Sequence, residues 1–536
     1  MLHVLIIALF MVVVLHDGWR SGLSPSSAAS RAGSLEIWVS ALGPMLVLAL
    51  ATWATIGALA RDVQRRGSWR SARMAERTLG LSRWAAVLLH AANVLSIGLL
   101  DEVRMRIGDL IALDELAVIS LPIGIFLVGW WAYEPIERTL RDATTLRMLD
   151  SGRPVFAAPT RAQYVLLQLR HQVLLSLVPI GMIAVWSEAM QRGLRWLASH
   201  ASRPGNPHHG LLARIGDHLS TESAMAWANT ALQLLGVAIV FAISPLLLRR
   251  VWDTVRIAPG PLRSRLAAIC SRSGVRIRDL LVWRTHGTMI NGAVIGLIAP
   301  LRYILLTDAL LEHLSSRQVE AVMAHEVGHA RHKHMPWLTL SMLVGITGAA
   351  TMLSLLAWGA IYLLDALGHS RAAHAVDQSS LAEGGIVVGS FILGLSWFGF
   401  ISRRFEWQAD AFAAQQLSLT PAASPYYEES VEPTLWGFSS HPSERSPVTP
   451  PATRITTEAV ASMTGALEAV AELNHMSRGR KSWRHGSIAY RQHRLRSLIG
   501  HPLDRLRIDR VVRRLKAALA LALAAIIALA VWSQFA

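Results

Sequence analysis

The chain has 536 residues, of which 52% are hydrophobic and 16% are charged, and its mean hydropathy is +0.36. This composition excludes an ordinary soluble protein, because several stretches of about twenty residues carry almost no charge, as a bilayer core requires. The net charge of +16 is not accompanied by a basic-aromatic module, so it indicates loops facing anionic lipid and no nucleic-acid partner. The single cysteine, Cys270, excludes an internal disulfide and a thiolate metal cluster.

Apolar runs predict about nine membrane spans. The first, Leu2–Leu15, is short, and a cleaved signal peptide is the alternative. We favour an anchor, because no Lys or Arg precedes the apolar run. The remaining predicted spans are Ile37–Ala60, Trp84–Leu100, Leu116–Tyr133, Gln172–Trp186, Met225–Leu248, Trp337–Leu364, Gly385–Ile401 and Ala517–Trp532.

The charges of the loops predict the topology. Residues 61–83 contain seven arginines and residues 138–170 contain six, whereas residues 101–115 contain five acidic residues against two arginines. By the positive-inside rule the two arginine-rich loops are cytoplasmic. Strict alternation then places both long polar stretches, Arg249–Met335 and Ser402–Lys516, in the cytoplasm. With the Arg- and Ala-rich composition, this predicts a multi-pass protein of a bacterial inner membrane.

The two polar stretches contain signals for secondary structure and for a linker. Helical periodicity and strand-like apolar runs identify the elements, and a Pro/Ser-rich composition identifies the linker. In chain order the predicted elements are helix Leu262–Ser273, strands Leu280–Trp283 and Tyr303–Leu306, helix Gln318–His334, helix Phe405–Leu417, a flexible linker near 420–453, and helix Thr457–Asn474.

The sharpest chemical signal is His325-Glu326-Val327-Gly328-His329 on a predicted helix. Residues four apart share a helical face, so both imidazoles can bind one metal ion. Glu326 lies beside the first ligand, where it can act as general base toward water activated by the metal. This ligand set predicts one Zn²⁺ per chain. Charged residues flank the motif, so the site is expected at the membrane interface. An intramembrane metalloprotease, by contrast, carries this motif inside an apolar span.

A catalytic zinc needs a third protein ligand. A His six residues after the second motif His is one solution, but that position is Met335. The nearby His332 and His334 are too close along the same predicted helix, and we expect them at a polar helix end or behind the ligands. Glu406 and Asp410, four apart after the eighth span, can provide a ligand and a partner for a ligand His. From the residues alone, a solvated charge cluster is an equal alternative.

The order H-E-V-G-H, two spans and E-W-Q-A-D resembles the membrane gluzincins of the CAAX prenyl protease type I and HtpX-like family. The resemblance covers roughly residues 245–496. It implies that Glu406 is the third zinc ligand, in a Glu-x-x-Ala-Asp segment that ends at Asp410. It also implies that Asn291, Gly292 and Ala293 lie in an edge strand that pairs with the substrate backbone. The usual Asn-Ala is interrupted here by Gly292.

The family also carries a late His, followed by an Arg, close to the metal. Two histidines compete for this position. His485 has Arg491 at the better spacing but lacks the adjacent Pro, whereas His441-Pro442 lies in the linker. We favour His485 as a donor to the developing oxyanion, with a surface basic patch as the alternative.

These observations predict a mainly α-helical polytopic membrane protein with a cytoplasmic zincin-like α+β catalytic domain. The expected function is hydrolysis of peptide bonds in membrane or membrane-associated proteins, with a protein or peptide substrate and the lipid bilayer as partners. A catalytically silent zincin-like sensor or transporter is the alternative. The predicted organisation is a membrane region at 1–248, a first metallopeptidase part at 249–335, two spans at 336–401, a second metallopeptidase part at 402–515 and a C-terminal span at 516–536.

Overall fold

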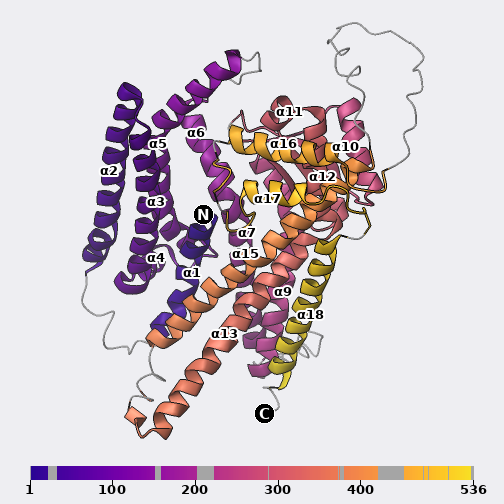
Figure 1. Cartoon of the computed structure of the whole chain (residues 1–536). Coiled ribbons are helices and arrows are strands. Elements are labelled where there is room, and N and C mark those ends of the chain that lie inside the picture. Colours follow the sequence, from indigo (N-terminus) through magenta and orange to yellow (C-terminus); the bar gives the residue numbers. More distant parts are fainter. Residues whose placement is uncertain are drawn as a thin grey trace, which may run out of the picture. The chain divides into compact units, whose positions relative to one another are not determined.

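The computed structural model of the chain describes residues 2–21, 33–150, 159–201, 222–287, 289–371, 374, 380–420, 452–474, 476–480, 482–504 and 506–532. The chain forms two compact units, Met1–Asp253 and Thr254–Ala536, whose α-helices are labelled in Figure 1. Nearly all of the predicted linker near 420–453, including His441, lies outside the described residues.

The described part of the first unit is helical. Gly98, with a φ of 83°, ends one helical segment, and the next leaves at an angle of 70°; glycine adopts such a left-handed conformation without steric cost. The elements are α1 (Leu2–Ser21), α2 (Ser34–Arg66), α3 (Trp69–Ala92), the π-helical turn η1 (Asn93–Ile97), α4 (Leu99–Ile107), α5 (Leu113–Asp150), α6 (Arg161–Gln168), the π-helical turn η2 (Leu169–Leu174), α7 (Leu175–Ala201) and α9 (Glu222–Val251).

Six helical segments of the described chain are long and apolar enough to cross a membrane, and the bent α3–α4 pair adds a seventh if it forms one span. Each coincides with a predicted span. Of the other two, Leu2–Leu15 falls in α1, whose apolar part is short, and Ala517–Trp532 falls in α18 (Arg507–Trp532). The predicted polytopic helical class is therefore confirmed, with six or seven full-length spans against about nine expected.

The second unit contains a four-stranded mixed sheet with the order β1-β2-β4-β3. The strands are β1 (Thr254–Arg256), β2 (Asp279–Trp283), β3 (Gly292–Ile295) and β4 (Tyr303–Thr307). β2 and β4 are parallel, whereas β1 and β3 pair antiparallel with them. The apolar runs of β2 and β4 form the buried centre of the sheet, which confirms both predicted strands. β3 lies at an edge, so one side of its backbone does not pair within the sheet.

Helices surround the sheet and extend from it. The predicted helix Phe405–Leu417 and the span before it form one continuous helix, α15. The helical elements are α10 (Pro261–Arg272), the 3-10 turn η3 (Ala299–Leu301), α11 (Asp308–His313), α12 (Ser316–Arg331), α13 (His334–Ala366), α15 (Ser380–Ser418), α16 (Thr457–Leu473), α17 (Ile488–Arg496) and α18.

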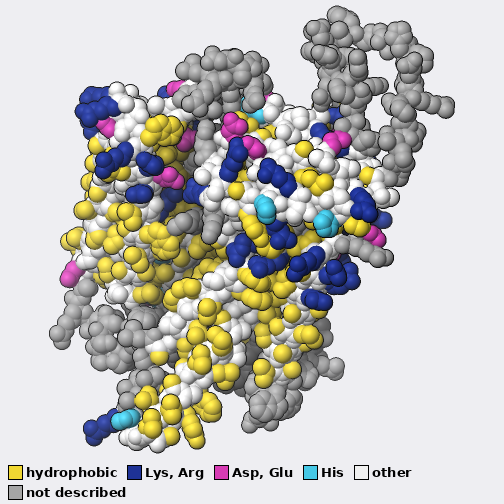
Figure 2. All heavy atoms as spheres, viewed as in Figure 1, with side chains coloured by type: hydrophobic (Ala, Val, Ile, Leu, Met, Phe, Trp, Pro, Cys, Tyr) yellow, Lys and Arg dark blue, Asp and Glu magenta, His cyan; other side chains and the backbone are white. Residues whose placement is uncertain are grey.

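The long helices α13 and α15 pack closely against each other. A Cβ atom at Gly394 would lie 2.4 Å from Cγ1 of Ile346, and one at Gly345 would lie 2.7 Å from Cδ1 of Trp397. Small residues permit this close approach between apolar helices, as in membrane bundles. Figure 2 shows hydrophobic side chains along these helices, whereas Lys and Arg gather nearer the sheet-containing part of the unit.

The predicted helix Gln318–His334 is divided in the structure, which corrects the expectation that His334 continues it. α12 ends at Arg331, Lys333 adopts a left-handed conformation with a φ of 53°, and α13 begins at His334. A left-handed residue interrupts the helical path. His334 therefore begins a new helix, and its ring meets His329 from a different direction.

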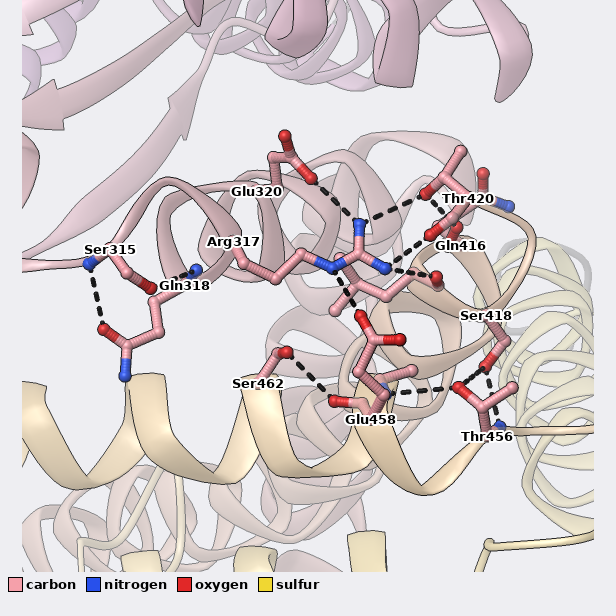
Figure 3. Close-up of polar contacts among 12 residues, drawn as sticks. Ser315, Arg317, Gln318, Glu320, Gln416, Ser418, Thr420, Thr456, Glu458 and Ser462 are labelled. Carbon is pink, nitrogen blue, oxygen red and sulfur yellow. Dashed lines mark hydrogen bonds and ion pairs between the residues drawn. The ribbon is translucent and has the colours of Figure 1, made fainter. Parts of the chain in front are cut away.

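The start of α12 is fixed to the end of α15 and to α16 by Arg317 (Figure 3). The guanidinium donates to the carbonyl oxygens of Leu417 and Thr420 and pairs with Glu320 and Glu458. A capping box between Ser315 and Gln318 satisfies the first backbone N–H groups of α12. These contacts set the position of α12 relative to α15, and the chemistry of the unit lies between these two helices.

Candidate metal centre

Three side chains predicted as metal ligands converge in the second unit. His325 and His329 lie one turn apart on α12, and Glu406 lies on α15, which packs against α12. The Nε2 atoms of the two histidines are 3.2 Å apart. Each of these nitrogens lies 3.6 Å from a carboxylate oxygen of Glu406. The three side chains are only 10%, 17% and 6% exposed.

The spacing of these donors fits a zinc ion. Ligand atoms about 2.1 Å from a tetrahedral ion lie about 3.4 Å from one another. The observed separations are 3.2, 3.6 and 3.6 Å. Two imidazoles and one carboxylate form a common donor set for catalytic zinc, which leaves the fourth position to water or substrate. The residues present therefore satisfy both the geometry and the chemistry of such a centre.

His325 is held from behind by an acidic residue that is itself held by an arginine. Its Nδ1 atom lies 3.0 Å from Oδ1 of Asp410. The guanidinium of Arg491, on α17, donates to both oxygens of Asp410 over 2.8 and 2.6 Å. Arg491 also lies 3.5 Å from Glu406. A carboxylate behind Nδ1 keeps the hydrogen on that atom and directs the Nε2 lone pair forward.

His329 has His334 behind it, which is one of the two positions expected for His334. Its Nδ1 atom lies 2.9 Å from Nδ1 of His334, and Nε2 of His334 lies 3.0 Å from Oε1 of Gln408. His334 is fully buried. The specific contact with His329 depends on the break between α12 and α13 at Lys333.

Glu326 faces the edge strand of the sheet. A Cβ atom at Gly292 would lie 3.2 Å from Cγ of Glu326 and 2.9 Å from Cγ1 of Val322. β3 therefore approaches α12 so closely that a side chain at this position would have to displace Val322 or Glu326, which explains the glycine between Asn291 and Ala293. A hydrogen bond from the Val294 backbone to Glu326 favours its charged form.

The beginning of the edge strand is fixed by Asn474, which follows α16. Its side-chain amide donates to the carbonyl oxygen of Ile290 over 2.8 Å and accepts from the Ile290 backbone N–H over 3.0 Å. Asn291 then exchanges hydrogen bonds with Thr307 of β4. These contacts hold Asn291, Gly292 and Ala293 in line beside α12.

His485 also lies at the cluster. Its Nδ1 atom is 2.9 Å from Oε1 of Glu406, while 48% of its side chain is exposed. The histidine belongs to a tight turn in which Ser482 and Gly486 pair, and Arg403 of α15 donates to the carbonyl oxygen of Trp483. The turn places one side of the imidazole at the site and leaves the other accessible.

The site holds its side chains in different charge states. Burial lowers the pKa of His329 to about 3, which keeps its lone pair free. Burial also disfavours a charged His325, but Asp410 and Glu406 outweigh this effect and raise the pKa of His325 to about 10. Burial, with the nearby Glu406, raises the pKa of Glu326. A raised carboxyl pKa suits a group that accepts and returns a proton.

A polytopic helical chain with an H-E-x-x-H helix, a distant glutamate and a neighbouring edge strand defines a membrane metallopeptidase. Residues 266–448 match Peptidase family M48, a segment that contains the H-E-V-G-H motif, Glu406 and Asp410. This part of the chain is therefore similar to M48 metallopeptidases, and the predicted resemblance to the CAAX prenyl protease type I and HtpX-like group is confirmed.

Two known proteins are similar to this chain. The Protease HtpX homolog of Aeropyrum pernix is 29% identical over 225 residues, which cover 38% of this chain and 67% of that protein. The crystal structure of S. mikatae Ste24p aligns over 87% of this chain and 100% of its own, with 12% identity and a TM-score of 0.33.

Proposed function

We propose that this protein is a zinc-dependent endopeptidase that hydrolyses peptide bonds of membrane or membrane-associated proteins. The observation that carries the proposal is the convergence of His325, His329 and Glu406, with donor atoms 3.2 to 3.6 Å apart. Glu326 on the same helix supports catalysis over passive metal binding, because a purely structural metal site has no use for a base beside it.

In the proposed mechanism His325, His329 and Glu406 would hold one zinc ion, which when bound would supply Lewis-acid polarisation of the scissile carbonyl and a lowered pKa of water. Oε of Glu326 accepts a proton from the attacking water and later delivers it to the leaving amine nitrogen. His485, whose imidazole is half exposed beside the cluster, donates a hydrogen bond to the developing oxyanion.

The proposed substrate binds as an extended strand along β3. This strand ends the sheet, and Gly292 brings it against Glu326. An added strand would form backbone hydrogen bonds with β3, which requires an unfolded segment of substrate and little sequence recognition. Membrane or membrane-adjacent proteins are the proposed class, because the apolar helices α13 and α15 extend directly from the site.

We further propose that the site faces the cytoplasm, in a bacterial inner membrane, as the arginine-rich loops indicate. The proposed organisation has a membrane region at 1–248, metallopeptidase parts at 249–335 and 402–515 separated by two spans at 336–401, and a C-terminal span at 516–536.

The test is cleavage of casein and of a model peptide by the purified full chain, with zinc content measured in the same samples. Glu326→Gln is expected to retain zinc and to lose activity by about 10² to 10⁴-fold, the contribution of a general base. Glu406→Ala is expected to lose zinc. Equal activity in Glu326→Gln would overturn the mechanism, and full zinc retention in Glu406→Ala would remove Glu406 from the ligand set. A protein that binds zinc and cleaves neither substrate would favour the silent sensor.

A further inference from the structure

A chain of hydrogen bonds leads from His329 to the C-terminal helix. His329 on α12 contacts His334 on α13, which contacts Gln408 on α15. The Gln408 amide nitrogen donates to Oδ1 of Asp509 on α18 over 2.7 Å. Four helices, separated by as many as 180 residues in sequence, thus share one line of polar contacts.

Asp509, the last residue of this series, determines which atom is donor and which is acceptor in every contact. An ionised Asp509 carboxylate only accepts, so the Gln408 amide nitrogen must face it and Oε1 must face His334. Nε2 of His334 then carries the hydrogen, and its Nδ1 is an acceptor. The hydrogen of His329 must therefore lie on Nδ1, and its Nε2 lone pair points toward His325 and Glu406.

The surroundings favour this single arrangement. His334 is fully buried, and its ring stacks on that of Phe405 with centroids 4.4 Å apart. Gln408 is only 4% exposed. α18 packs on both α13 and α15, and Lys516 donates to the carbonyl oxygen of His332 over 2.6 Å. A buried polar chain of this kind is stable only when each member is satisfied.

We propose that His334, Gln408 and Asp509 are positioning residues that fix the tautomer and orientation of His329, so that α18 contributes to metal affinity. The proposal rests on the proposed metal site and extends it to the C-terminal helix. Residues behind a ligand of this kind change metal affinity by about 10- to 100-fold when they are removed.

The test is zinc affinity of the purified full chain, measured by competition with a graded series of chelators. His334→Phe keeps an aromatic ring on Phe405 but removes the acceptor for His329. His334→Asn loses the ring but places an oxygen near the former Nδ1 position. The expected affinity losses are about 10- to 100-fold for His334→Phe and smaller for His334→Asn. A packing role alone predicts the reverse order.

His332→Phe is the matched control, because this neighbouring ring stacks on His334 but has no place in the polar chain. It is expected to stay within about threefold of the original affinity, and Asp509→Leu is expected to weaken zinc binding. Unchanged zinc affinity in either His334→Phe or Asp509→Leu would contradict the proposed positioning role. If His334→Phe does not fold, His334→Asn and Asp509→Leu decide the outcome.

Failure of the proposed positioning role is distinguishable from failure of the metal site. If the original protein binds no zinc, the proposed function is contradicted. If it binds zinc and these substitutions leave the zinc affinity unchanged, only the positioning role is contradicted. The visible spectrum of the Co²⁺-substituted protein gives a second readout. We expect it to change in His334→Phe and Asp509→Leu and not in His332→Phe, because ligand orientation sets the geometry around the ion.

Discussion

Oδ1 of Asp410 lies 3.0 Å from Nδ1 of His325, and Arg491 holds both oxygens of the same carboxylate. The carboxylate thereby orients the ring of a proposed ligand. Asp410→Asn retains the shape but removes the charge, and its amide can present a donor to Nδ1. We expect zinc affinity to fall by about 10- to 100-fold, as measured by chelator competition.

Arg491→Lys provides a companion to this change. Lysine retains the charge but cannot form the two parallel bonds of a guanidinium, so a smaller loss of affinity is expected than for Asp410→Asn. If Asp410→Asn binds zinc as tightly as the original protein, the carboxylate does not support His325.

The pH dependence of zinc binding follows from the state of His325. Because its pKa is raised to about 10 without metal, the ring is protonated at neutral pH. A ligand imidazole must be neutral, so zinc has to displace one proton. Apparent affinity should therefore rise by about tenfold per pH unit between pH 7 and 9. Calorimetry in buffers of different ionisation enthalpy measures the released proton.

The raised pKa of His325 also predicts how the stability of the metal-free protein depends on pH. The folded pKa of His325 lies above its unfolded value near 6.5. Its contribution to stability is thus fully present below pH 6.5 and is lost as pH rises toward 10. Asp410→Asn removes the leading interaction that raises this pKa and should flatten both pH profiles. Zinc affinity that is independent of pH in the original protein would contradict the assignment.

Gly292→Ala tests the approach of β3 to Glu326. The new methyl group would lie 3.2 Å from Cγ of Glu326 and must displace that side chain or Val322. We expect the rate of peptide cleavage to fall by about 10- to 100-fold, because a displaced base loses its alignment. Zinc content should not change. Gly479→Ala is the control, since a Cβ there meets no atom within 4 Å. Equal rates for both variants would show that Glu326 is not sensitive to this contact.

Cys270 provides a measure of folding. Burial in α10 raises the pKa of its thiol to about 12, so the reactive thiolate is scarce at pH 8. The folded protein should resist iodoacetamide, and the protein unfolded in denaturant should gain one adduct. Ala267→Cys, at an exposed position of the same helix, should react in the folded state. Rapid modification of Cys270 in the folded protein would contradict its burial.

The sequence by itself determined the elements of the site. Local periodicity is enough to place His325 and His329 on one face of a helix, and Glu406 and Asp410 on one face of another, because helical geometry repeats over four residues. Apolar runs likewise identified the full-length spans, since their length reflects the bilayer and not the packing of neighbours. The family resemblance then connected Glu406 to the two histidines.

The tertiary structure decided the contacts between elements. The left-handed Lys333 separates α12 from α13, and His334 at the start of α13 contacts His329, whereas the sequence pattern predicted one continuous helix. Gln408 and Asp509 have no local signature, because each acquires its role only from a partner on another helix. The close contact of Gly292 with Val322 and Glu326 also depends on how closely β3 approaches α12. Periodicity describes one element at a time, and these features arise only when several elements pack together.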